Sequence, residues 1–131
     1  MILAMVDDLL FLSRIQETAK QLGVEVKAVQ PADLPQAAVE AAPSALMIDL
    51  NHRSGKSLTV LRALKAESGT ASIPAVGFVS HVQTELIAAA REAGCNLVLA
   101  RSAFAGQLAS LLQRFSKSET PGPGGTQNPG P

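Results

Sequence analysis

Short apolar runs recur along the chain at intervals of roughly 20 to 25 residues, the spacing of repeated strand–helix units. They predict five strands, at residues 2–6, 25–29, 45–48, 75–79 and 97–100. The segments that follow the strands carry apolar residues at helical spacing and predict five helices, at residues 10–22, 33–42, 57–67, 82–93 and 104–115. Three strands, with the sequences ILAMV, ALMI and LVLA, are apolar throughout, as strands covered on both faces must be.

The ends of several predicted helices carry local signals. Gly23 and Gly94 come just after the first and fourth helices, where a residue in the left-handed region closes the last turn. Asp33 followed by Pro35 is typical of a helix start. Strands and helices that alternate with short links imply right-handed crossovers. The sequence therefore predicts an α/β fold of the doubly wound type, with a parallel sheet between two layers of helices.

Length and composition predict one domain followed by a tail. With 131 residues, of which 47% are apolar, the chain is long enough to bury a core. The sequence TPGPGGTQNPGP at the end of the chain has almost no apolar side chain that could offset the entropy of ordering. We therefore expect a domain at residues 1–117 and a disordered Pro/Gly-rich tail at residues 118–131.

The charge balance argues against several classes of partner. The chain has 11 basic and 11 acidic residues, so there is no electrostatic reason to expect nucleic acid or an anionic membrane as a partner. Tyr and Trp are absent, which leaves no aromatic platform for stacking bases. The apolar start of the chain is interrupted by Asp7 and Asp8, which is not typical of a signal peptide. With a single cysteine, Cys95, the composition favours a cytoplasmic protein.

Acidic side chains follow two of the predicted strands. Asp7 and Asp8 come directly after the first strand, and Asp49 comes directly after the third. If these strands are neighbours, their ends lie about 4.8 Å apart, and the three side chains can converge. Converging carboxylates repel one another unless they share a cation, so they indicate a hard divalent ion such as Mg²⁺. The alternative for any one of these residues is a helix cap or a turn.

Four blocks follow one another along the chain: MVDDLLFLSRI, ALMIDLNHRSGKSL, IPAVGFVSH and GCNLVLARSAF. In this order and spacing they resemble the receiver domains of bacterial two-component response regulators, the CheY-like family. The resemblance covers about the first 117 residues. It implies a flavodoxin-like sheet of five parallel strands in the order 2-1-3-4-5, with five helices.

The resemblance also implies roles for the acidic residues. By position, Asp7 and Asp8 would hold Mg²⁺, and Asp49 would contribute to the metal site and accept a phosphoryl group from a histidine kinase. Asn51 would offer its backbone carbonyl to the metal. A carboxylate nucleophile that attacks phosphorus in line, with a cation to neutralise the transferring oxygens, is chemically sound.

The chain departs from the family pattern where that family changes conformation on phosphorylation. Counting five residues from Pro74, where the family has Thr or Ser, reaches Val79, and Ser80 would replace that hydroxyl only if the strand shifted by one residue. The family's Lys-Pro pair is Arg101-Ser102 here, and Arg has a longer, planar head group than Lys. Val98 stands where the family has a switch aromatic.

A run of basic residues lies around the third predicted helix. All four charged residues between Arg53 and Lys65 are basic. They could meet an acidic partner or form a solvated helix face, and the sequence does not distinguish the two.

Taken together, these features predict a signalling module rather than an enzyme. We expect a pseudo-receiver that acts through protein contacts, using the face of the fourth helix, fifth strand and fifth helix, with phosphorylation-driven switching weakened or lost. One alternative is a functional phospho-acceptor that uses Asp49 and Mg²⁺, with Arg101 and Ser80 in place of the family's Lys and hydroxyl. A second is a flavodoxin-like module that binds a small ligand. The oligomeric state stays open between monomer and homodimer.

Overall fold

The computed structural model describes residues 1–116, which form a parallel five-stranded sheet in the order β2-β1-β3-β4-β5. This is the predicted strand order. The strands are β1 (Ile2–Met5), β2 (Val26–Ala28), β3 (Ala45–Asp49), β4 (Ala75–Val79) and β5 (Leu97–Ala100). The helices are α1 (Leu9–Leu22), α2 (Leu34–Ala41), α3 (Ser57–Ala66), α4 (Thr84–Glu92), α5 (Arg101–Gly106) and α6 (Leu108–Phe115). The tail predicted at residues 118–131 lies outside the described residues.

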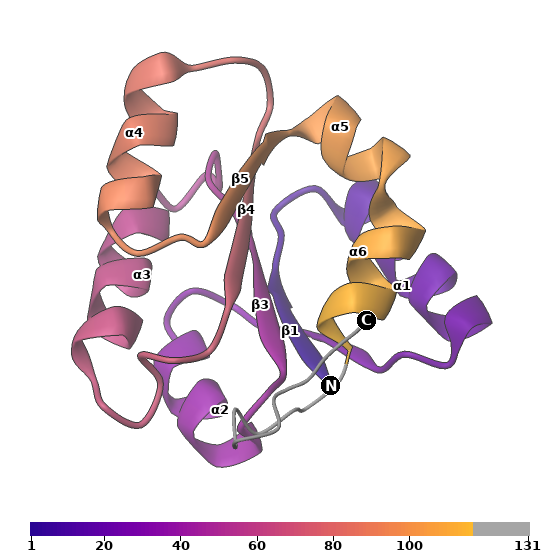
Figure 1. The fold of residues 1–131 in the computed structure, drawn as a ribbon, viewed down its shortest axis with the longest axis horizontal. Coiled ribbons are helices and arrows are strands. Elements are labelled where there is room, and N and C mark those ends of the chain that lie inside the picture. The colour runs from indigo at the N-terminus through magenta and orange to yellow at the C-terminus, as the bar shows by residue number, and fades with distance from the viewer. Residues whose placement is uncertain (117–131) are drawn as a thin grey trace.

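Helices cover both faces of the sheet, as the doubly wound prediction requires (Figure 1). Helices α1 and α6 lie on one face, and α2, α3 and α4 lie on the other. Successive strand residues point to opposite faces, so Ile2 and Ala4 of β1 pack under α1 and α6 while Leu3 and Met5 pack under the other layer. All four are fully buried, which explains why this strand is apolar throughout.

Two helices occupy the segment for which the sequence predicts a single one. The apolar residues of segment 104–115 keep the same helical spacing from end to end. Four of them pack into the cluster beneath α1 and α6: Phe104, Leu108, Leu111 and Leu112. The backbone nevertheless breaks at Gln107, with φ −110° and ψ 12°, just after Gly106. Glycine has a low helix propensity, so this is a weak point of the helix. The first of the two helices also begins at Arg101, three residues earlier than predicted.

The other predicted elements agree with the structure to within two residues at each end. Gly23 is in the left-handed region with φ 73° and caps α1, as predicted. Gly94 also has a positive φ, of 110°. Pro35 lies in the first turn of α2, although the Asp33 side chain makes no capping hydrogen bond. Among the helices of residues 1–116, none has both the length and the apolar character needed to cross a membrane.

The sheet register brings the acidic residues to one edge. Strand β1 pairs with β3, and Met5 lies opposite Ile48. Asp7 therefore follows β1 by two residues at the same end of the sheet where β3 finishes with Asp49. In parallel sheets of this kind, ligand sites lie beyond the carboxyl ends of the strands.

Candidate functional site

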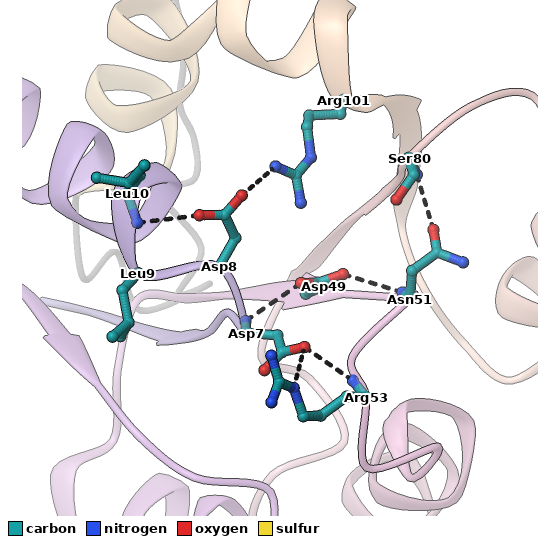
Figure 2. Close-up of a pocket in the computed structure, with 9 residues that line it drawn as sticks. All are labelled: Asp7, Asp8, Leu9, Leu10, Asp49, Asn51, Arg53, Ser80 and Arg101. Atoms are coloured by element: carbon teal, nitrogen blue, oxygen red, sulfur yellow. Dashed lines mark hydrogen bonds and ion pairs between the residues drawn. The ribbon is translucent and has the colours of Figure 1, made fainter.

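A pocket opens at this edge of the sheet, and we call it the acid pocket (Figure 2). The residues that line it come from the ends of β1, β3, β4 and β5 and from the start of α1. They include the six residues to which Sequence analysis gave a candidate role in the site: Asp7, Asp8, Asp49, Asn51, Ser80 and Arg101. The lining residues are Asp7, Asp8, Leu9, Leu10, Asp49, Asn51, Arg53, Ser80 and Arg101.

Asp49 is the most deeply placed acid of the pocket, with only 2% of its surface exposed. Its Oδ1 accepts a hydrogen bond from the Asn51 backbone N–H at 2.9 Å, and its Oδ2 accepts one from the Asp7 backbone N–H at 3.2 Å. The Ser57 hydroxyl, at the start of α3, donates to the Asp49 carbonyl at 2.6 Å. The carboxylate is thereby held in one orientation, with a hydrogen bond that ties it to the end of β1.

Asp8 caps helix α1. Its Oδ1 accepts hydrogen bonds from the backbone N–H groups of Leu10 at 2.9 Å and Phe11 at 3.2 Å. Its Oδ2 accepts a hydrogen bond from Arg101 Nη1 at 3.0 Å. A carboxylate at this position satisfies two free N–H groups and the positive end of the helix dipole. The helix-cap alternative considered from the sequence therefore describes Asp8, which also faces the pocket (Figure 2).

Asp7 is bound by the loop that follows β3. Its Oδ2 accepts hydrogen bonds from the Arg53 backbone N–H and from Arg53 Nε, both at 3.1 Å. The Arg53 side chain is 85% exposed, whereas that of Asp7 is 24% exposed. The pair is thus formed between a partly shielded acid and a guanidinium that reaches it from solvent.

Both of these acids have a pKa below the ordinary value of 3.8. Burial by itself would raise the pKa of Asp7, but the hydrogen bonds and the charge of Arg53 outweigh it. The pKa of Asp8 is lowered first by the Phe11 N–H at the helix start and then by Arg101, against a smaller effect of burial. Both carboxylates are therefore ionised at neutral pH and are stabilised by partners within the chain.

Arg101 is fixed by packing as well as by charge. Its guanidinium carbon lies 4.6 Å from the centre of the Phe11 ring and 5.6 Å from that of Phe78, within the range of cation–π contacts. Its side chain is 29% exposed, and its Nε is buried without a hydrogen-bond partner among the described residues. The planar head group suits this stacking, so the Arg in place of the family's Lys is accommodated by aromatic rings.

Ser80, not Val79, lines the pocket. Val79 is fully buried and packs in the cluster beneath α2, α3 and α4, whereas Phe78, one residue earlier, faces the opposite layer. Ser80 follows the last residue of β4, outside the strand, and is exposed. The Ser80 backbone N–H donates to Asn51 Oδ1 at 2.7 Å (Figure 2).

The side chain of Asn51 joins the loop after β3, to which it belongs, to the loop between β4 and α4. Its Oδ1 accepts from Ser80 N–H, and its Nδ2 donates to Gln83 Oε1 at 2.9 Å. Val98, the residue in place of the family's switch aromatic, is buried with 7% exposure in the cluster beneath α3 and α4. The two histidines, His52 and His81, do not line the pocket.

Arg53 and the rings beneath Arg101 are the parts of the site that sequence reasoning missed. In the sequence Arg53 belongs to the run of basic residues around the third predicted helix, but in the structure it lies in the loop before α3 and pairs with Asp7. A second member of that group, Lys65, is only half exposed and donates to the carbonyls of Ala71 and Ile73. The sequence holds a weak signal that Arg53 lies near the pocket. It follows Asp49 by four residues, in a loop that begins at the same edge of the sheet as the acids.

The acid pocket offers the oxygen ligands that Mg²⁺ prefers, but in this structure they are not arranged to hold the ion. The three carboxylates and the Asn51 carbonyl are the oxygen ligands that hard cations prefer. Within residues 1–116, however, no group of three or more His, Cys, Asp or Glu side chains is arranged so as to hold a metal ion. The reason is visible in Figure 2, where Asp7 and Asp8 turn towards Arg53 and Arg101. The oxygen ligands fit the ion chemically, and Arg53 is the partner that is exposed enough to give way to it.

The carboxyl groups of Asp7 and Asp8 are expected to titrate below 3.8 in the folded protein. Because the pKa is lowered on folding, these groups stabilise the fold at pH values above 3.8, and that stabilisation is lost as the pH falls through the folded pKa. An NMR titration of the side-chain carboxyl carbons measures both values.

Two variants test the causes given for these shifts. In Arg53→Gln the pKa of Asp7 should rise, and in Arg101→Gln that of Asp8 should rise, because each loses a charged donor. Arg62→Gln, an exposed position on α3, is the matched control and should change neither. An Asp7 pKa that is the same in Arg53→Gln and in the unchanged protein would contradict the assigned cause.

Comparison with known proteins identifies the fold. No protein-family model matches the sequence, and no curated protein is significantly similar to it. Among solved structures, the receiver domain of a sensor histidine kinase from Pseudomonas aeruginosa, with a magnesium ion in its active-site cleft, is similar with a TM-score of 0.76 and 20% identity over 87% of this chain and 94% of that one. The chemotaxis protein CheY4 of Vibrio cholerae has a TM-score of 0.76 and 18% identity over 87% and 96% of the two chains.

A third similar structure is the Mn²⁺-bound form of the response regulator Rcp1, with a TM-score of 0.73 and 17% identity over 91% of this chain and 96% of that one. In all three cases the alignment includes nearly the whole of the solved chain, so the likeness concerns a complete domain. The strand order and the helix layers described above agree with it. The described part of this chain thus has the CheY-like fold of response-regulator receiver domains.

Proposed function

We propose that this chain is a receiver-like signalling module that acts through protein contacts, with phosphorylation-driven switching weakened or lost. The observation that carries this proposal is the pairing of Asp7 with Arg53 and of Asp8 with Arg101. Two of the three pocket acids already have positive partners from the same chain, and Asp49 receives two backbone N–H groups. The carboxylates of the pocket are therefore bound by groups of the chain itself, with which a cation or a phosphoryl group would have to compete.

The residues expected to transmit a change support the same proposal. Val79 and Val98 are both packed into the apolar cluster beneath α2, α3 and α4. Neither side chain has a hydroxyl that could form a hydrogen bond with a phosphoryl oxygen. We infer that the face of α4, β5 and α5 presents a constant surface to protein partners. Val82, just before α4, is 73% exposed and would be available to such a partner.

A second candidate is a functional phospho-acceptor, and one observation favours it. Asp49, Ser80 and Arg101 line the same pocket, although they come from three different strand ends. An Asp49 carboxylate oxygen would attack the phosphorus of a phosphodonor, the bond from phosphorus to the donor would break, and the donor would leave with that electron pair. Two of the similar structures contain Mg²⁺ or Mn²⁺. Such an ion, held by Asp7, Asp8, Asp49 and the Asn51 carbonyl, would neutralise charge on the transferring oxygens.

Incubation with Mg²⁺ and a small acyl-phosphate donor, followed by intact-mass measurement, separates the two candidates. We expect no more than a small fraction of the chain to gain a phosphoryl group under conditions that fully label an active receiver domain. Asp49→Asn removes the acceptor oxygen's charge with little change of shape, and Asp33→Asn, at the start of α2, is the matched control. Near-complete labelling that is lost in Asp49→Asn and kept in Asp33→Asn would replace the first proposal with the second.

A further inference from the structure

The acid pocket contains its own cations, and the two arginines are held in very different ways. The three acids contribute three negative charges, and Arg53 and Arg101 contribute two positive ones. A divalent cation in the pocket would have to bind the same carboxylates. It would also be repelled by any guanidinium that stayed beside them.

Arg101 is not free to leave. Its guanidinium stacks on the Phe11 and Phe78 rings at 4.6 and 5.6 Å, and it also bonds Asp8 at 3.0 Å. Only 29% of its side chain is exposed. Moving it would uncover apolar ring surface and remove a partner from Asp8, which remains bound by the N-terminus of α1.

Arg53 is held by far less. Its side chain is 85% exposed, and its only hydrogen bond among the described residues joins Nε to Asp7 Oδ2. Exposed ion pairs of this kind contribute little, because water and salt screen the charges and the long side chain loses freedom. The loop does not depend on the side chain, since the Arg53 backbone N–H binds the same Asp7 oxygen separately.

We propose that Arg53 is a displaceable internal counter-ion that competes with a divalent cation for Asp7 and so sets the cation affinity of the acid pocket. This inference rests on the receiver-like pocket of the proposed function. With Arg53 in place, Asp7 is neutralised by a single charge from the chain. When Arg53 swings into solvent, Asp7, Asp49 and the Asn51 carbonyl are available to an ion that prefers oxygen ligands. Arg101 stays and holds Asp8 in either state.

Binding of Mn²⁺, followed by its electron paramagnetic resonance signal in low-salt buffer, tests the proposal on the full chain. Arg53→Ala removes the competing charge but keeps the backbone hydrogen bond, so the loop stays anchored. It should bind Mn²⁺ about three- to tenfold more tightly, the effect of removing one charge from a mostly hydrated site. Mg²⁺ should displace the Mn²⁺. Arg62→Ala, an exposed arginine on α3, controls for net charge and should bind like the unchanged protein.

Two further variants complete the test. Arg53→Lys keeps the charge on a flexible stem and should bind Mn²⁺ nearly as weakly as the unchanged protein. Asp7→Asn removes the acid for which ion and arginine compete, so Arg53→Ala should add nothing in the Asp7→Asn background. Both variants retain the backbone contact that Asp7 N–H makes with Asp49.

Each outcome decides whether Arg53 and the divalent cation compete for Asp7. Equal Mn²⁺ affinity in the unchanged protein and in Arg53→Ala overturns the proposal, as does equal tightening in Arg53→Ala and Arg62→Ala. Failure of every variant to bind Mn²⁺ overturns it too, because there is then no ion to compete with. These results are independent of the mass measurement at Asp49, so the proposed function can fail while the competition holds, and the reverse.

Discussion

Phe104→Ala is expected to destabilise the fold by about 3–5 kcal/mol, the usual cost of removing a fully buried aromatic ring. Phe104 has no exposed surface. Its ring centre lies 4.8 Å from that of Phe78 and 5.8 Å from that of Phe11. The three rings fill the space between the sheet and the helices α1 and α5. Two of them, Phe11 and Phe78, also stack against Arg101. Loss of one ring leaves a cavity that these rigid neighbours cannot close.

Urea-induced unfolding followed by circular dichroism measures this change, and Phe115→Ala is the control. Phe115 is also a phenylalanine of the C-terminal helices, but it is only partly buried, at the end of α6. Its removal should cost clearly less than that of Phe104. Equal losses in the two variants would show that the three-ring cluster has no special share in the stability of the fold.

Gly94→Ala is expected to destabilise the protein by about 2–4 kcal/mol, from backbone strain and overpacking together. Gly94 has φ 110°, which side-chain-bearing residues rarely adopt. An added Cβ would lie 2.5 Å from Lys65 Cγ. Lys65 cannot readily move aside, because its Nζ donates to the carbonyls of Ala71 and Ile73 and to Asn96 Oδ1. The turn between α4 and β5 is therefore closed to any larger residue.

Gly69→Ala is the matched control for this prediction. Gly69 lies in the turn after α3, an added Cβ there would meet nothing within 4 Å, and its φ is not positive. Its replacement should leave the free energy of unfolding within about 1 kcal/mol of the original or raise it slightly, since alanine restricts the unfolded chain. Thermal unfolding of both variants gives the comparison. Equal stability of Gly94→Ala and Gly69→Ala would contradict the clash with Lys65.

Most of the fold could be predicted from the order of residues along the chain. Strand β1 is apolar over its whole length, and β3 is apolar up to its last residue, Asp49. A strand buried on both faces needs that pattern whatever its neighbours are. The helices show their apolar period within a few turns, and Gly23 marks the end of α1. The break at Gln107 could not be predicted, because the apolar period passes through it without interruption.

The sequence by itself determined the doubly wound architecture, because strand burial and connection handedness depend on local patterns. The strand order that brings Asp7, Asp8 and Asp49 to one edge was implied by the resemblance to receiver domains, and the structure has that order. Only the tertiary structure decided which partners these acids have. The pairs Asp7–Arg53 and Asp8–Arg101 join residues 46 and 93 positions apart, and no local pattern encodes such a contact. The structure also decided that Ser80 lines the pocket, since that depends on where the loop after β4 lies relative to Asn51, to which the Ser80 backbone N–H donates.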